Sequence, residues 1–174
     1  PHSMKTPTNL RGHQFAAPWS AALIVITIFG SLVLLGVGFL VGYLEPPREV
    51  TIRWLVAVPC LLMPPWFALF AIRGYQIEAR ELRVNRPLWS TRIPLDDLRE
   101  NIVDPEAMRR ALRLFGNGGL FAFTGWFRNR RLGTFRAFPT DPARAVVLTF
   151  PHRRIVVTPR DPAAFVQALE SRHG

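Results

Sequence analysis

The sequence predicts an α+β protein that is mainly β: a two-helix transmembrane hairpin, then a curved antiparallel β-barrel or sandwich with a C-terminal capping helix. Two long apolar runs, 18–44 and 54–72, contain no Asp, Glu, Lys or Arg. After Arg73 the sequence alternates between apolar and polar residues, which is typical of strands. Near the end, Asp161 and Pro162 form the start signal of a helix.

These patterns divide the 174 residues into four parts. Residues 1–4, PHSM, resemble a scar left by cloning, and residues 5–17 form a cytoplasmic N-terminal tail. Residues 18–72 form the transmembrane hairpin, and residues 74–174 form the β domain. The net charge of +10 favours anionic partners such as lipid headgroups. The single cysteine, Cys60, excludes a disulfide within the chain.

Both apolar runs are long enough to cross a bilayer. The run 18–44 exceeds the ~20 residues that a spanning helix needs, and Trp19 and Tyr43 lie near its ends, where aromatic rings favour the interface. The run 54–72 would extend over about 28 Å as a helix, which is just enough. Its three prolines predict kinks, and a re-entrant segment is the alternative interpretation.

The basic residues around the runs predict their orientation. Two lie before the first run and two in the link between the runs, whereas five follow the second run within 73–92. This excess places both termini in the cytoplasm. Gly38 and Gly42 have the GxxxG spacing that lets helices approach closely. We expect these glycines to pack the two spans together, with homodimerisation as the alternative.

The remaining elements follow from apolar spacing and turn signals. Residues 75–95 predict three short strands, and residues 105–115 predict a helix with Asp104 as its N-cap and Gly116 at its end. Two β-hairpins follow, formed by 120–127 with 131–138 and by 145–150 with 154–159. In the last helix, 161–171, the apolar residues Phe165, Val166 and Leu169 form one stripe.

Several of these motifs together resemble one family. They are YQIEARELRV, IPLDDL, LFGNGGLFAFTGWFRNRRLGTFRAF, RAVVLTF and RIVVTPRDPAAFVQAL. Over residues 74–171 the chain is similar to the bacterial pleckstrin-homology-like (PH-like) domains that follow a transmembrane hairpin. The resemblance implies a curved seven-stranded sheet, or two orthogonal sheets, with a helix that caps one end. It implies no catalytic residue, and it implies a multi-pass protein of the bacterial inner membrane.

The motifs of common enzyme sites and cofactor sites do not occur in the sequence. The GNGG segment has neither the lysine of a phosphate-binding Walker loop nor the strand-to-helix setting of a dinucleotide fingerprint. The histidines are isolated, and the sequence has no zinc-protease or nucleophile-elbow motif. The aromatic strand lacks the setting of an RNA-recognition motif. We therefore expect no enzyme, no cofactor, no metal site and no nucleic-acid partner.

The predicted function is that of a membrane-anchored binding or scaffold module. Its cytoplasmic PH-like domain would engage a protein partner or the anionic inner-membrane surface. The alternative is an accessory or oligomerising subunit of a larger membrane complex for transport or the envelope, and an unrecognised enzyme is the third hypothesis. Aromatic and basic residues favour anionic lipid surfaces. The candidate lipid contacts are Arg128, Arg130, Arg131 and Trp126 at a hairpin turn, and Arg109, Arg110 and Arg113 on the predicted helix.

Overall fold

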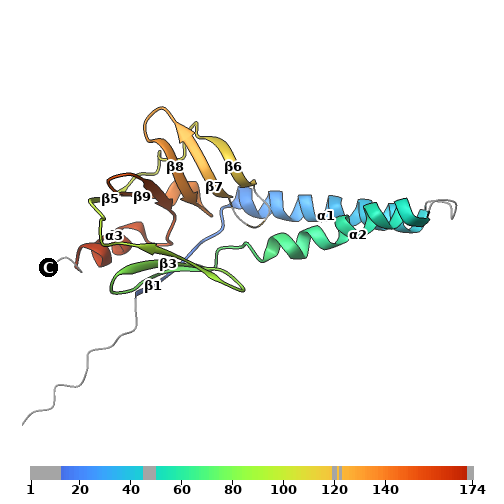
Figure 1. Cartoon of the computed structure of the whole chain (residues 1–174), viewed down its shortest axis with the longest axis horizontal. Coiled ribbons are helices and arrows are strands. Elements are labelled where there is room, and N and C mark those ends of the chain that lie inside the picture. The colour runs from blue at the N-terminus through green and yellow to red at the C-terminus, as the bar shows by residue number, and fades with distance from the viewer. Residues whose placement is uncertain (1–12, 45–49, 119–120, 122, 172–174) are drawn as a thin grey trace, which may run out of the picture.

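The computed structural model describes residues 13–44, 50–118, 121 and 123–171. Its helices are α1 (Ala21–Leu44), α2 (Val50–Ala68) and α3 (Pro162–Glu170), with a short 3₁₀ helix, η2 (Pro142–Arg144). Its strands are β1 (His13–Ala16), β2 (Gly74–Ile77), β3 (Glu81–Asn85), β4 (Ser90–Pro94), β5 (Glu100–Val103), β6 (Leu112–Gly118), β7 (Phe123–Asn129), β8 (Gly133–Phe138), β9 (Val146–Thr149) and β10 (Arg154–Val157). Figure 1 shows the sheets and α3 at one end of the molecule, with α1 and α2 projecting from them side by side.

The first sheet has the strand order β1-β2-β3-β4 and is antiparallel throughout. Its last three strands confirm the meander predicted over 75–95. β1 is an addition to the prediction, because residues 13–16 lie within the segment interpreted as a tail. This strand pairs with β2 from His13 opposite Ile77 to Ala16 opposite Gly74. A four-residue strand directly before a long apolar helix is too short for its alternation to be recognised.

The second sheet has the strand order β5-β9-β10-β8-β7-β6. The predicted hairpins are confirmed, since β7 pairs with β8 and β9 pairs with β10, both antiparallel. The prediction of a purely antiparallel architecture is wrong at one place, where β10 and β8 run parallel from Ile155 opposite Arg136 to Val157 opposite Phe138. The segment between these strands, which includes η2 and β9, provides the crossover that a parallel pair requires.

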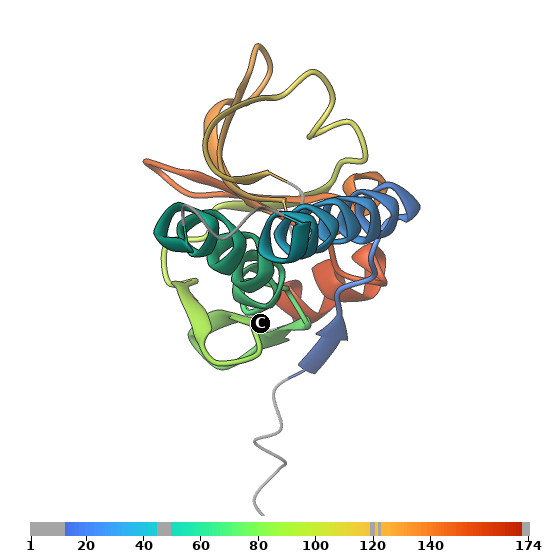
Figure 2. The ribbon, with the colours of Figure 1, turned by 90° about the vertical axis from the view of Figure 1, so that its right-hand side faces the viewer.

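The main core lies between the two sheets and against α3. It includes Tyr75, Leu82 and Leu148 from the strands, together with Phe165 and Leu169 from the last helix. The predicted N-cap is confirmed, because Asp161 accepts a hydrogen bond from the Ala164 amide at 3.0 Å. The apolar stripe of α3 faces the core, with Phe165 and Leu169 buried and Val166 partly buried. Figure 2 shows the two sheets on opposite sides of the helical pair when the molecule is viewed along it.

A smaller core covers the other face of the second sheet. Phe127, Phe135, Val147 and Val156 project from the strands to this side, and Ala107 covers them from the connection between β5 and β6. Adjacent residues of one strand therefore reach different cores, because side chains alternate between the faces of a sheet. The second sheet is consequently buried on both faces in its central strands.

The helix predicted for 105–115 is wrong. Residues 105–110 form consecutive turns, and residues from Leu112 onward form β6, which pairs with β7. The apolar stripe expected on the helix does not exist, since Leu112 and Phe115 are exposed while Ala107 is buried. Pairing with β7 satisfies the backbone groups on the side of β6 that faces β7, and this tertiary gain exceeds the local preference for a helix.

α1 and α2 pack along each other, and they differ in their capacity to span a membrane. Residues 21–43 of α1 are long and apolar enough to cross, and only 11% of the most apolar window is buried within the chain. The apolar part of α2, 53–68, is shorter than a spanning helix, although Pro59, Pro64 and Pro65 all lie inside one continuous helix. Among the described residues, one helix of the predicted pair thus has the properties of a span.

Candidate functional site

An arginine-lined pocket lies between the connection from β5 to β6 and the turn from β7 to β8. Its volume is about 950 Å³. The lining residues are Glu106, Arg109, Arg110, Leu112, Arg128, Asn129, Arg130, Arg131 and Gly133. Two segments about twenty positions apart in the sequence thus bring five arginines to one concave surface.

Asn129 ties the two walls of this pocket together. Its side-chain amide donates a hydrogen bond to the carbonyl of Ala107 at 2.9 Å, across to the opposite wall. Its side-chain oxygen accepts from the backbone amides of Arg131 at 3.1 Å and Leu132 at 2.7 Å, which shapes the turn. An ion pair between Arg131 and Asp104 adds a second link between the walls. The two segments that carry the arginines are therefore joined by a hydrogen bond and an ion pair.

The five arginines differ in their partners. Arg109 lies 2.6 Å from Glu106, whose carboxylate accepts its hydrogen bond and thereby raises the pKa of Arg109. Arg131 pairs with Asp104. Within the described part of the chain, Arg110, Arg128 and Arg130 have no ion pair. Arg110 also has a φ of 52°, a left-handed conformation that costs a non-glycine residue about 1–2 kcal/mol.

The structure brings together five of the seven predicted lipid contacts. Arg109, Arg110, Arg128, Arg130 and Arg131 share the pocket. Two predicted contacts lie outside it: Arg113 is on β6, and Trp126 is on β7 beside Phe115 of β6. Lipid contact by these seven residues remains a prediction.

The pocket is lined by Asn129, the last residue of β7, and Figure 1 shows that this end of β7 is the one farther from the helices. The near end is marked by Phe121, whose amide donates a hydrogen bond to the hydroxyl of Thr27 in α1 at 3.1 Å. From Phe123 to Asn129, β7 extends over about 20 Å. The arginines of the turn therefore lie well away from the junction between the sheets and α1.

Aromatic rings collect at the junction between the helices and the sheets. Trp66 and Phe70 lie 6.5 Å apart near the end of α2, and Phe70 meets Trp89 of the β3–β4 turn edge-on at 5.1 Å. Beside α1, the rings of Trp19 and Phe121 lie 6.1 Å apart. We name these five residues the aromatic collar. Tryptophan rings are enriched at membrane–water interfaces in membrane proteins.

Two further arginines approach each other beside the collar. The guanidinium groups of Arg86 and Arg136 lie 5.8 Å and 4.9 Å from the ring centroid of Phe138, and Arg86 also lies 5.7 Å from that of Trp89. Burial lowers the pKa of Arg86, and the positive charge of Arg136 lowers it further. The buried Nε of Arg86 has no hydrogen-bond partner among the described residues.

Sequence reasoning did not select Arg86 and Arg136, although part of the signal is visible. Arg86 and Trp89 bracket the turn in NRPLW, and Arg136 follows the buried Phe135, so its side chain points to the opposite face. Their approach depends on the packing of two sheets, which spacing along the chain does not reveal. Asn129 was visible only as part of the turn RNR.

The two glycines selected for helix packing lie between α1 and α2. A Cβ atom at Gly38 would come within 3.0 Å of a Leu61 side-chain carbon and 3.2 Å of the Ala57 carbonyl oxygen. One at Gly42 would lie 3.7 Å from the Cβ of Ala57, which is an ordinary contact. Gly38 is thus at the closer approach of the two.

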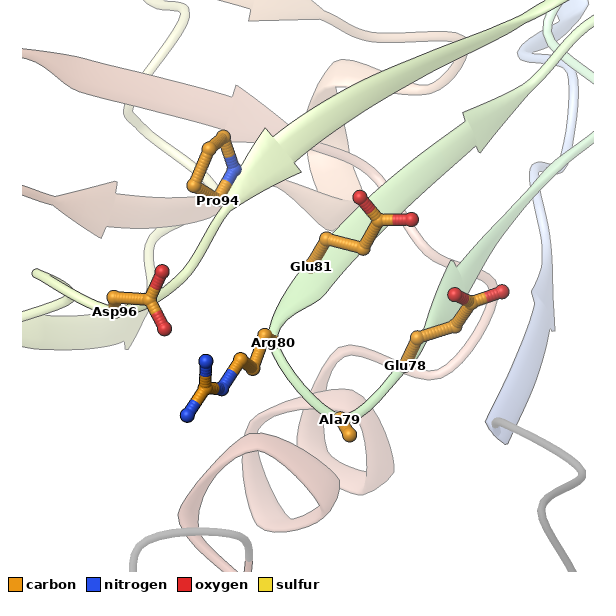
Figure 3. Close-up of a pocket in the computed structure, with 6 residues that line it drawn as sticks. All are labelled: Glu78, Ala79, Arg80, Glu81, Pro94 and Asp96. Carbon is orange, nitrogen blue, oxygen red and sulfur yellow. The ribbon is translucent and has the colours of Figure 1, made fainter.

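A second pocket, of about 460 Å³, lies at the β2–β3 turn and is lined partly by acidic residues. Figure 3 shows Glu78 and Glu81 on one side of it and Asp96 with Arg80 on the other. Arg83 lies 2.9 Å from Glu78 and 2.6 Å from Glu81, and its hydrogen bond lowers the pKa of Glu81. A carboxylate held ionised in this way is a poor general acid at neutral pH.

The described residues contain no group of three or more His, Cys, Asp or Glu side chains placed to hold a metal ion.

Comparison with known proteins gives one finding. The model of the bacterial PH domain family matches residues 73–173, which is more than half of the chain. Neither the curated proteins nor the solved structures gave a match. Bacterial PH domains are generally non-catalytic modules, and the chain belongs to this family.

Proposed function

We propose that the protein is a membrane-anchored, non-enzymatic binding module that holds its PH-like domain against the cytoplasmic surface of the bacterial inner membrane. The observation that carries this proposal is the aromatic collar at the place where α1 and α2 meet the sheets. α1 supplies the anchor, and α2 lies along it as the second, shorter crossing. Both termini then lie in the cytoplasm.

The apolar surface of α1 supports the membrane assignment. A helix that packs in a soluble core is mostly buried, whereas the most apolar window of α1 is 11% buried. Its outward side chains include Phe29, Leu32 and Leu40, all more than half exposed. In water this surface would form an apolar patch far larger than monomeric soluble proteins expose.

The contact of Phe121 with α1 sets the depth of the domain. Thr27 lies six residues after Ala21, which is about 9 Å along the helix. Phe121 therefore reaches past the start of α1, to the level at which an interfacial aromatic ring would lie. Its φ of 65° is unusual for a residue with a side chain, and the surrounding contacts hold it there.

Alkaline carbonate extraction of cells that produce the full chain tests the anchor. We expect the protein to stay in the membrane pellet at full length, because an inserted helix resists extraction that strips peripheral proteins. A reporter fused after Gly174 should be active only in the cytoplasm. Release into the supernatant contradicts membrane insertion. A product shortened by the α1 segment indicates a cleaved signal sequence, and a periplasmic reporter contradicts the orientation.

The pair formed by Arg86 and Arg136 is the site proposed to contact anionic lipid. Two like charges beside a shared ring, neither of them in an ion pair within the described chain, favour a bound anion. The adjacent Trp89 belongs to the aromatic collar, so a lipid phosphate is the anion at hand. Lipid contact by the turn at 128–131 stays a separate prediction.

The double variant Arg86→Gln/Arg136→Gln tests this contact. Each basic residue near an anionic lipid surface contributes about 1 kcal/mol, so loss of both should weaken phosphatidylglycerol binding roughly thirtyfold. Binding is measured on the detergent-purified chain by native mass spectrometry with titrated lipid. The matched control, Arg99→Gln/Arg160→Gln, removes the same charge from exposed sites elsewhere. Equal weakening in both double variants contradicts a specific lipid contact.

The second candidate function is that of an accessory subunit, and the edge of the second sheet favours it. β6 is the last strand of its sheet, and its exposed apolar residues are Leu112, Leu114 and Phe115. An open edge with apolar side chains can pair with a strand of another protein. If the lipid experiment shows no specific contact, the accessory role becomes the better supported function.

A further inference from the structure

We infer that the arginine-lined pocket binds a compact ligand that carries two or more phosphoryl groups. This inference goes beyond the proposed membrane function and does not rest on it, because the pocket lies at the other end of the second sheet from the collar.

The charge of the pocket selects the ligand. Five arginines against Glu106 and the Asp104 carboxylate that pairs with Arg131 leave an excess of three positive charges at the pocket. A phosphoryl group carries about 1.5 to 2 negative charges at neutral pH, so two such groups would balance this excess. A carboxylate ligand would need three separate groups in the same space. Guanidinium groups also match phosphate oxygens through paired hydrogen bonds.

Three of the arginines are available for such bonds. Arg110, Arg128 and Arg130 are exposed and have no ion pair within the described chain. Arg109 and Arg131 are each held by an acid, which leaves some of their donors for a ligand. The pocket therefore carries two arginines that acids hold in place and three arginines whose guanidinium groups have no ion pair.

The frame around these arginines is preorganised. Asn129 joins the turn to the Ala107 carbonyl, and Arg131 joins it to Asp104, so the two walls hold their separation without a ligand. Arg110 occupies its left-handed conformation on the opposite wall from Arg128 and Arg130. Preorganised donors lower the ordering cost of binding. A hairpin turn that only contacts solvent would not need the hydrogen bond of Asn129 or the ion pair of Arg131.

The size and place of the pocket limit the source of the phosphate. About 950 Å³ lies within the range of small-molecule sites. The opening is about 20 Å along β7 from the contact with α1, which separates it from the headgroups that the aromatic collar would contact. The two remaining sources are a soluble phosphorylated compound and the headgroups of a second, apposed membrane.

Calorimetric titration of the full chain in neutral detergent, at low salt, tests the site with pyrophosphate as the probe and citrate as its carboxylate counterpart. We expect pyrophosphate to bind more tightly than citrate. The variant Arg110→Gln/Arg128→Gln/Arg130→Gln should weaken pyrophosphate binding by about a thousandfold, because each of the three charge-assisted contacts contributes roughly tenfold. The control Arg92→Gln/Arg99→Gln/Arg160→Gln removes the same charge from exposed positions outside the pocket.

The outcomes distinguish specific binding in the pocket from non-specific attraction of the anion to the basic surface. Retained binding in the control and loss in the pocket variant support the inference. Equal loss in both variants, tighter binding of citrate, or no binding of pyrophosphate to the parent overturns it. Circular dichroism checks that the pocket variant is folded. The single variant Arg130→Gln, at an exposed turn, provides a second reading of the same effect if the triple variant is misfolded.

Flotation distinguishes the two sources of phosphate. The chain in nanodiscs of zwitterionic lipid is mixed with separate vesicles that contain phosphatidylglycerol. Capture that the pocket variant loses and the control retains assigns the headgroups of a second membrane as the ligand. Binding of pyrophosphate without vesicle capture assigns a soluble compound. Failure of the Arg86/Arg136 lipid test leaves both results unchanged, so the two proposals fail separately.

Discussion

Replacement of Phe165 by alanine is expected to lower the free energy of unfolding by about 3–5 kcal/mol. Phe165 belongs to α3, and its side chain is fully buried in the main core. Its ring meets Phe15 of β1 edge-on at 5.1 Å and Tyr75 of β2 at 6.3 Å. Removal of the ring would leave a cavity where the last helix, the first strand and the first sheet meet, and a close-packed core relaxes only partly into such a space.

Guanidinium unfolding of the full chain in mild detergent, followed by near-ultraviolet circular dichroism, measures this loss. The matched control is Gln167→Ala, which truncates an exposed side chain in the same helix and should change stability little. An equal, small effect of both substitutions would mean that α3 does not pack on the sheets as described.

The same contact shows why the fold was only partly predictable from the sequence. α3 follows from local signals, since Asp161 caps it and Phe165 and Leu169 recur on one face. The strands of β2–β4 and the two hairpins likewise follow from alternation and from turns a few residues long. The ring of Phe15, in contrast, reaches Phe165 from a strand that the local pattern does not reveal.

The incorrect predictions share a physical cause. For residues 105–115 the capping signal at Asp104 and the apolar spacing both favoured a helix, but pairing with β7 outweighed them from Leu112 onward. The parallel pairing of β8 with β10 depends on how a crossover packs, and no short-range pattern encodes it. In both cases the structure was determined by pairing between strands that are distant from each other in the sequence.

The candidate site was predictable in its residues and not in its arrangement. The basic character of 109–113 and 128–131 is plain in the sequence, yet the predicted helix gave no reason to place the two groups around one pocket. Only the turn conformation of 105–110 and the hydrogen bond from Asn129 to Ala107 bring them to one pocket. Arg86 and Arg136 approach each other through sheet packing in the same way.

The second large effect is expected at the buried hydroxyl of Tyr75. This group donates a hydrogen bond to the carbonyl of Phe138 at 2.6 Å and accepts one from the Thr158 amide at 3.2 Å. The hydroxyl of Thr158 in turn accepts from the Thr140 amide at 2.9 Å. Tyr75→Phe leaves the Phe138 carbonyl and the Thr158 amide without this partner, so it should cost about 1–3 kcal/mol at neutral pH.

The pH dependence of this cost identifies the hydroxyl as its cause. Burial raises the pKa of Tyr75 from 10.0 to about 12, an effect that the hydrogen bonds with Thr158 partly oppose. Between these values the unfolded chain loses the proton while the folded chain keeps it, so the stabilisation is complete below pH 10 and is lost as pH rises to about 12. The difference corresponds to roughly 3 kcal/mol. Unfolding titrations across this window should show the parent and the Tyr43→Phe control losing stability together, while Tyr75→Phe loses less by that amount. Parallel curves for all three proteins would contradict the buried, protonated hydroxyl.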